Sequence, residues 1–232
     1  MVKKLENLVE IANPEEPHLA CVLLLDTSGS MVEEDKITLL NEGIKVYKKS
    51  VLEDNLARKR VELAVITFGK GGVQVIHDFS SIEDFEPQSL EADDYTPMGE
   101  AILKAIELVE QRKQQYKDRG IDYYRPWIFL ITDGEPTDMR PGDLKWNEVV
   151  KSVYEGEANG KFLFFAVGVL PANMDLLRQL APPNRPPALL REKKFKEMFL
   201  WLSKSHASVS ASRVGEQVRT ETPKSWAEFS TH

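Results

Sequence analysis

The sequence predicts a doubly wound α/β domain with a mostly parallel central sheet, one antiparallel edge strand and helices on both faces. Several short apolar runs stop at turn residues without polar alternation, which is typical of buried parallel strands. Longer segments with apolar residues at helical spacing lie between these runs, so strands and helices alternate from residue 19 to about residue 210. A glycine-rich turn at 69–72 joins two strands directly, and this hairpin indicates the antiparallel edge strand.

The individual elements follow in chain order. Strands are predicted at 19–25, 61–69, 73–79, 126–131, 161–169 and 188–190. Helices are predicted at 37–56, 97–119, 143–160, 172–181 and 195–210. Thr96 precedes Pro97 at the start of the second helix, which is the expected pairing of a helix cap and a first helical residue.

Three segments are expected along the chain. Residues 1–16 form a polar N-terminal arm, residues 17–210 form the α/β domain, and residues 211–232 form a C-terminal tail. The tail is polar except for "WAEF" at 226–229, which either docks back on the domain or engages a partner.

Composition excludes some classes of function. A net charge of −7 over 232 residues leaves no basic excess to neutralise phosphates, so a nucleic-acid partner is not expected. The single cysteine, Cys21, lies in an apolar run and has no partner for a disulfide within the chain, which favours a reducing compartment. No apolar run is long enough to span a bilayer. We therefore expect a soluble, cytoplasmic protein without a membrane partner.

Oxygen-bearing side chains gather in three loops that follow or face the ends of predicted strands. Asp26, Ser28 and Ser30 alternate after the first strand, Thr96 precedes the second helix, and Asp133 follows the strand at 126–131. Ligands of open α/β sheets bind where such loops converge, at the carboxyl ends of the strands. Oxygen ligands without histidine or cysteine suit a hard cation, so we predict a site for Mg²⁺, or for Mn²⁺ or Ca²⁺.

Structural roles are the alternative for each of these residues. Ser28 and Ser30 could cap the following helix, although capping leaves Asp26 unexplained. Thr96 could cap the helix at 97–119, with or without a second role as a ligand. Asp133 followed by glycine is also a common turn pair.

The segment "DTSGS" (26–30) resembles the Asp-x-Ser-x-Ser signature of von Willebrand factor A domains, which carry a metal-ion-dependent adhesion site (MIDAS). That family also places a threonine before a central helix, here Thr96, and an aspartate after the fourth strand, here Asp133. The resemblance covers about residues 17–210. The segments "ACVLLLDTSGSM", "TPMGEAI" and "YYRPWIFLITDGEPTD" are most similar to sequences of the bacterial TerY-type branch of this family. That branch is associated with tellurite-resistance and stress operons.

The resemblance implies how the site works. Ser28, Ser30 and Thr96 would ligate the metal directly, and Asp26 and Asp133 would hold it through water or by alternate direct contact. The domain would then be a protein-interaction module that binds an acidic residue of a partner through the cation. The TerY-type branch further implies a stress-response or defence system, with kinase-like and phosphatase products of the same operon as partners.

An enzyme is the competing class. A strand that ends in an aspartate among magnesium ligands is also typical of haloacid-dehalogenase-like phosphotransferases. These enzymes need a second aspartate two residues later, where this chain has Ser28, and a serine cannot act as a general acid or base at neutral pH. The chain has no P-loop and no Gly-x-Ser-x-Gly elbow. We therefore predict no enzymatic activity; a magnesium-dependent phosphotransferase and a scaffold with a structural metal are the alternatives.

Overall fold

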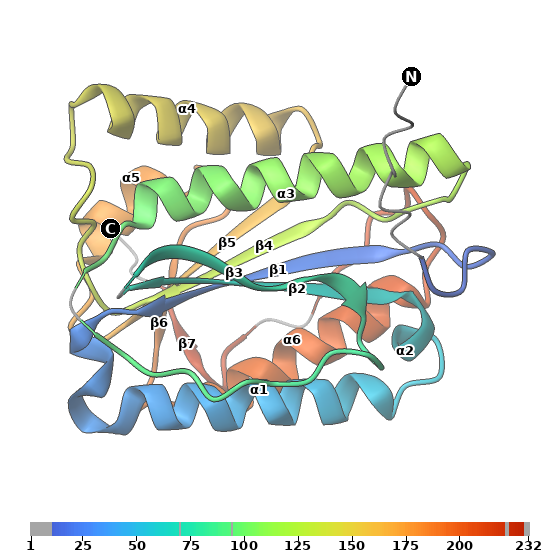
Figure 1. Ribbon diagram of the computed structural model, residues 1–232, viewed down its shortest axis with the longest axis horizontal. Coiled ribbons are helices and arrows are strands. Elements are labelled where there is room, and N and C mark those ends of the chain that lie inside the picture. Colours follow the sequence, from blue (N-terminus) through green and yellow to red (C-terminus); the bar gives the residue numbers. More distant parts are fainter. Residues whose placement is uncertain (1–10, 70, 94, 221–222, 230–232) are drawn as a thin grey trace, which may run out of the picture.

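The computed structural model describes residues 11–69, 71–93, 95–220 and 223–229. A seven-stranded sheet in the order β3-β2-β1-β4-β5-β6-β7 lies between two layers of helices (Figure 1). The strands are β1 (Leu19–Thr27), β2 (Val61–Gly69), β3 (Gly72–Ser81), β4 (Trp127–Thr132), β5 (Leu163–Val169), β6 (Ala188–Leu190) and β7 (Ala227–Glu228). The predicted α/β class is confirmed: β1 pairs in parallel with β2 and β4, and the predicted edge strand β3 is antiparallel.

Helices cover both faces of the sheet (Figure 1). The helices are η1 (Gly29–Asp35), α1 (Lys36–Leu52), α2 (Ala57–Arg60), α3 (Met98–Arg119), α4 (Leu144–Ala158), α5 (Met174–Leu180) and α6 (Phe195–Ser210). Side chains of α1 and α6 belong to one hydrophobic cluster, and those of α3, α4 and α5 to the other. Alternate residues of β1 contribute to each cluster: Leu23 to the first and Leu24 to the second. The apolar run is therefore unbroken because both of its faces are buried.

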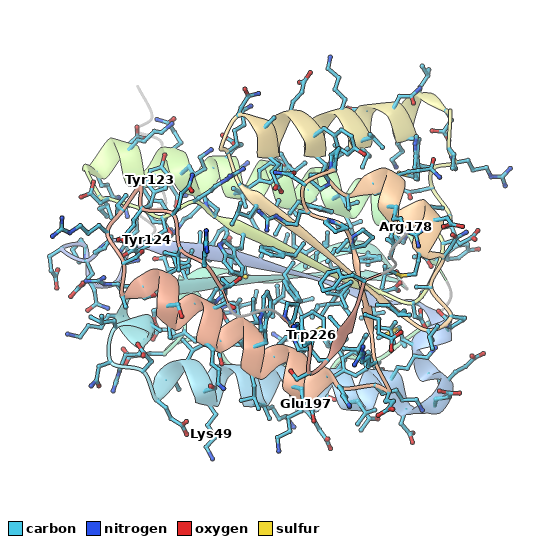
Figure 2. All side chains as sticks on the ribbon, turned by 180° about the vertical axis from the view of Figure 1, so that it is seen from behind. Lys49, Tyr123, Tyr124, Arg178, Glu197 and Trp226 are labelled. Atoms are coloured by element: carbon cyan, nitrogen blue, oxygen red, sulfur yellow. The ribbon has the colours of Figure 1, made fainter. Side chains whose placement is uncertain are left out.

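The C-terminal tail adds an element that the sequence did not predict. Strand β7 pairs antiparallel with β6 at the edge of the sheet. Trp226 (Figure 2) is only 2% exposed. Its ring centroid lies 5.4 Å from that of Trp201 in α6. The backbone N–H of Arg191 donates to the Trp226 carbonyl at 2.8 Å. Of the two possibilities for "WAEF", the described residues 226–229 therefore dock on the domain. Most of the predicted arm, residues 1–10, lies outside the described residues.

Candidate metal centre

The candidate residues lie where the winding of the sheet changes direction. β1 has β2 on one side and β4 on the other. The strands after β1 are therefore added first on one side of it, as β2 and β3, and then on the other side, from β4 onward. Such a switch point opens a crevice at the carboxyl ends of the strands. Asp26 is at the end of β1, and Asp133 directly follows β4. A hydrogen bond of 2.9 Å from the N–H of Asp93 to the carbonyl of Thr27 holds the loop that carries Thr96 against the same edge.

The loop after β1 turns its polar atoms inward. One carboxylate oxygen of Asp26 accepts the N–H of Ser28 at 2.8 Å, and the other accepts the hydroxyl of Thr132 in β4. The hydroxyls of Ser28 and Ser30 lie 3.1 Å apart. Ser28 precedes η1 but makes no side-chain capping bond there. The capping interpretation of Ser28 is therefore wrong.

The third loop joins this cluster through Asp133. The Ser30 hydroxyl donates to Oδ1 of Asp133 at 2.5 Å. The ammonium of Lys36 donates to Oδ2 of Asp133 at 2.6 Å, and also lies 3.2 Å from the carbonyl oxygen of Ser30. Lys36 and Asp133 are each only 2% exposed. Asp133 therefore does more than form a turn with the following glycine: it ties the β1 loop to the end of β4.

Thr96 faces the same space. A Cβ atom added to Gly134 would lie 3.5 Å from the Thr96 hydroxyl and 3.7 Å from Oδ2 of Asp26. The Thr96 hydroxyl and Oδ2 of Asp26 thus both lie close to Gly134, on the side of it where other residues carry a side chain. The structure brings together all five residues that the sequence nominated, from three separate loops.

The N-terminus of α3 is not capped as predicted. Its cap position is Pro97, which has no capping hydrogen bond, so the prediction that Thr96 caps this helix is wrong. Asp138, from the loop after β4, accepts the N–H groups of Gly99 at 3.0 Å and Glu100 at 2.9 Å instead. Lys145 pairs with the same carboxylate at 2.6 Å. Because Asp138 satisfies the helix end, the Thr96 hydroxyl is not required for it.

Removing this cap gives a first prediction. Asp138→Ala is expected to lower the free energy of unfolding by about 1–2 kcal/mol, the usual cost of losing a helix cap. Urea denaturation measures this loss. Glu155→Ala, which removes a 62% exposed carboxylate on α4, is the control and should change little. An Asp138→Ala protein as stable as the wild type would contradict the capping role.

Burial governs the electrostatics of the cluster. Loss of hydration raises the pKa of the Asp26 carboxyl to about 6, although hydrogen bonds from Ser28 and Thr132 favour the charged form. The nearby Asp133 carboxylate raises this pKa further. Asp26 therefore carries a charge at neutral pH that its surroundings only partly compensate, which is a condition that a bound cation would relieve.

The donor set fits a hard cation. Adjacent ligands of an octahedron about 2.1 Å from Mg²⁺ are about 3.0 Å apart; the Ser28 and Ser30 hydroxyls, at 3.1 Å, match this spacing. Within the described part of the chain, no group of three or more His, Cys, Asp or Glu side chains could hold a metal. The five candidate ligands are two carboxylates and three hydroxyls, so a search for carboxylate, histidine or cysteine ligands alone does not find this cluster.

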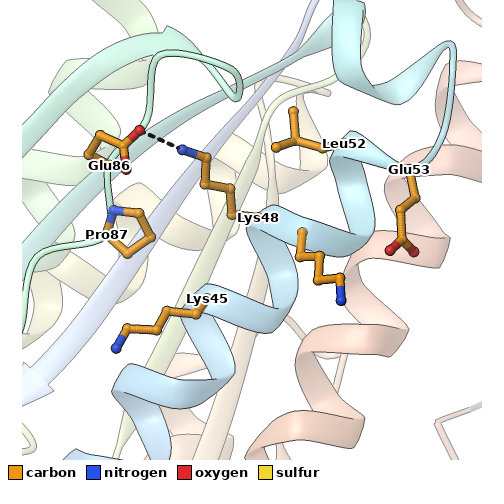
Figure 3. Close-up of a pocket in the computed structure, with 7 residues that line it drawn as sticks. Lys45, Lys48, Leu52, Glu53, Glu86 and Pro87 are labelled. Atoms are coloured by element: carbon orange, nitrogen blue, oxygen red, sulfur yellow. Dashed lines mark hydrogen bonds and ion pairs between the residues drawn. The ribbon is translucent and has the colours of Figure 1, made fainter.

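Sequence reasoning missed three residues of the site: Lys36, Thr132 and Asp138. A lysine at a helix start and a threonine at a strand end carry no pattern that distinguishes them from surface or core positions. Asp138 accepts N–H groups from a helix that begins 40 positions earlier in the chain, and no local pattern in the sequence predicts such a contact. A separate hollow on α1, lined by Lys45, Lys48 and Glu86 among others, contains none of the five nominated residues (Figure 3).

The profile of the von Willebrand factor type A domain matches residues 21–200. The chain belongs to this family. Comparison with curated protein sequences finds no significant match. In the described residues of this A domain, no helix combines the length and apolar character needed to cross a membrane.

Solved structures with the same fold come from diverse proteins. The pilus adhesin SpaC from Lactobacillus rhamnosus GG is 12% identical, with a TM-score of 0.63 over 83% of this chain and 31% of the adhesin. The PilB minor pilin from Streptococcus sanguinis is 14% identical, with a TM-score of 0.54 over 83% of this chain and 62% of the pilin. Proximal thread matrix protein 1 from the mussel byssus, solved with a zinc-occupied MIDAS motif, is 16% identical, with a TM-score of 0.53 over 83% of this chain and 48% of that protein. The A domain thus spans from about a third to under two thirds of these proteins, and at such identities the likeness shows the fold.

Proposed function

We propose that this A domain is a non-catalytic interaction module that binds an acidic residue of a partner protein through a divalent cation. Ser28, Ser30 and Thr96 would hold the cation directly, with Asp26 and Asp133 behind them. The observation that carries the proposal is the cluster itself, because it converges from three loops at a sheet switch point and holds more hydroxyls than carboxylates. Mg²⁺ suits this donor set, and Mn²⁺ or Ca²⁺ are the related candidates.

The hydroxyl-rich donor set favours a ligand from outside the chain. Neutral hydroxyls compensate little of a cation's charge, so a metal held by Ser28, Ser30 and Thr96 would stay electrophilic toward an external anion. Mg²⁺ commonly combines one or two protein carboxylates with ligands from a bound molecule. An aspartate or glutamate on a partner protein supplies such a ligand.

The surroundings of the cluster support a protein contact. Four large apolar side chains are exposed on the segments that follow β1, β4 and β5 or precede α3: Val32 in η1 (58%), Tyr95 (68%), Leu144 at the start of α4 (90%) and Leu170 (61%). Exposed apolar groups around a polar centre are common at protein-protein interfaces. A partner would bury them as its carboxylate reaches the metal.

Phosphotransfer is disfavoured by the environment of Asp26. Lys36 does reach the cluster, so a cation is available near the site. The Asp26 carboxylate, however, is fully buried, and both of its oxygens accept hydrogen bonds from the protein. A carboxylate held in this way is not placed to attack phosphorus, and the general acid two residues later is absent.

Thermal unfolding in the presence of metal tests the proposal. Protein stripped with EDTA should gain about 2.7 kcal/mol at a Mg²⁺ concentration of a hundred times Kd, which raises Tm by a few degrees. Thr96→Val and Ser28→Ala, which delete one hydroxyl each, should weaken this response, whereas Ser208→Ala on the exposed part of α6 should keep it. Acetate should add to the Mg²⁺ effect by offering the missing carboxylate.

Two results would contradict the proposal. If Mg²⁺, Mn²⁺ and Ca²⁺ all leave the Tm of the wild type unchanged, the claim that the domain binds a metal is contradicted. If Thr96→Val and Ser28→Ala respond to the metal as strongly as the wild type, the claim that these residues bind it is contradicted.

We also infer a cytoplasmic, TerY-type protein of a stress-response or defence system, whose partners include kinase-like and phosphatase products of the same operon. The similarity of the motif segments to TerY-type sequences supports the assignment to this branch. The buried, unpaired Cys21 supports a reducing compartment. A role in tellurite resistance would be indirect, through these partners. Mg²⁺-dependent co-purification of such neighbours from cytosol, lost in Thr96→Val, tests this part.

A further inference from the structure

Lys36 lies inside the proposed metal cluster. Its ammonium contacts Asp133 at 2.6 Å and the Ser30 carbonyl at 3.2 Å, and the residue is 2% exposed. Both contacted residues are members of the five-residue cluster. A positively charged side chain of the protein itself thus contacts the carboxylate that a divalent metal would use.

The local backbone does not favour this placement. Glu34 and Asp35, the two residues before Lys36, have positive φ angles of 55° and 60°, a region that residues other than glycine rarely adopt. Lys36 is also the first residue of α1, where the helix dipole disfavours a positive charge. The strained turn and the unfavourable helix position are offset by the ion pair with Asp133, so the ion pair accounts for where Lys36 lies.

We propose that Lys36 is a tethered cation that competes with the divalent metal for Asp133. This inference rests on the proposed function. A buried carboxylate without a cation is costly, so Lys36 stabilises the cluster when no metal is bound. A divalent ion beside Asp133 would repel the ammonium strongly, so the metal can approach Asp133 only if Lys36 withdraws. The affinity for metal is then lowered by the free energy of breaking the buried ion pair.

The competing interpretation is that Lys36 only positions Asp133 for the metal. The two interpretations differ in the sign of one measurement. A positioning residue, when neutralised, should weaken metal binding, whereas a competitor, when neutralised, should strengthen it.

Isothermal titration of Mg²⁺ into Lys36→Gln measures that sign. We expect a Kd lower than that of the wild type by about tenfold or more, together with a lower Tm in EDTA because Asp133 loses its partner. Lys193→Gln is the matched control: it removes a 37% exposed lysine that pairs with Glu34 at 2.8 Å, next to the same turn. Its Kd should stay within about twofold of the wild type.

A second measurement uses the wild-type protein and so does not depend on the folding of the variant. Amine acetylation followed by mass spectrometry should find Lys36 protected in EDTA and reactive at saturating Mg²⁺, with Lys193 reactive in both. Unchanged protection of Lys36, or a Kd in Lys36→Gln equal to or higher than the wild type, would overturn the competition. If the wild type does not bind metal, the proposed function fails as well, whereas metal binding by the wild type with an equal or higher Kd in Lys36→Gln overturns the competition alone.

Discussion

Asp26→Asn is expected to stabilise the protein in EDTA and to abolish its response to Mg²⁺. Burial raises the pKa of the Asp26 carboxyl to about 6, against about 3.9 for an ordinary aspartate. At neutral pH the folded protein therefore carries a charge that is more favourable in the unfolded chain. A neutral amide of the same shape keeps an oxygen for the Ser28 N–H and offers its NH2 to the Thr132 hydroxyl, which can rotate to accept it, so the substitution should raise the free energy of unfolding by about 1–3 kcal/mol. The same change removes the charge that attracts the metal.

The pH dependence gives a second readout of the same effect. Between pH 4 and pH 6 the folded protein binds the Asp26 proton and the unfolded chain releases it, because the folded pKa is the higher one. Stability from this group is thus present below about pH 4 and is lost as pH rises through 6. The advantage of Asp26→Asn over the wild type should grow across this range, and Mg²⁺ affinity of the wild type should fall below pH 6.

Urea denaturation at pH 4.5 and pH 7.5, in EDTA, checks these expectations. Asp118→Asn, an exposed position near the end of α3, serves as the control because it should have the same stability as the wild type at both pH values. Lower stability of Asp26→Asn at pH 7.5 would show that the carboxylate stabilises the fold, contrary to the argument from burial.

Arg112→Met is expected to cost about 3–5 kcal/mol of stability while leaving metal binding intact. Arg112 in α3 forms two hydrogen bonds with Glu62, at 2.7 Å and 2.6 Å, and both residues are almost fully buried. The Tyr116 hydroxyl donates to the same carboxylate, and His18 lies 3.4 Å from it. Without Arg112, the buried Glu62 charge keeps no full counter-ion.

The position of this network separates its effect from the metal site. Glu62 is at the amino end of β2, whereas the metal cluster is at the carboxyl end of β1 and β4. Urea denaturation should show the loss for Arg112→Met and little change for Lys104→Met, which is an exposed position on the same helix. The double variant Arg112→Met with Glu62→Gln should recover much of the loss because no unpaired charge remains. A Mg²⁺-induced rise in Tm similar to that of the wild type is expected throughout.

The sequence alone was sufficient for the fold class and for the membership of the oxygen cluster. Short unbroken apolar runs that stop at turn residues, such as the one that ends at Asp26, predict strands buried on both faces, and the helical spacing between these runs predicts the alternation of elements. Parallel strands end at one edge of a sheet, so polar residues at the ends of successive strands meet even when they are 107 positions apart, as Asp26 and Asp133 are. The strands, the helices and the polar residues at strand ends all follow from patterns of neighbouring residues, which the sequence contains directly.

Only the tertiary structure decided how that cluster is held and capped. Lys36 enters the cluster through two left-handed residues, Asp138 caps a helix 40 positions away, and Trp226 brings the tail back to β6. Each of these contacts joins residues that are distant along the chain and follow no periodic pattern. Their energies depend on burial and on the few ångströms between particular atoms, which are properties of the packed domain. The competition proposed for Lys36 arises at this level, because a lysine competes with a metal only when folding places both at one carboxylate.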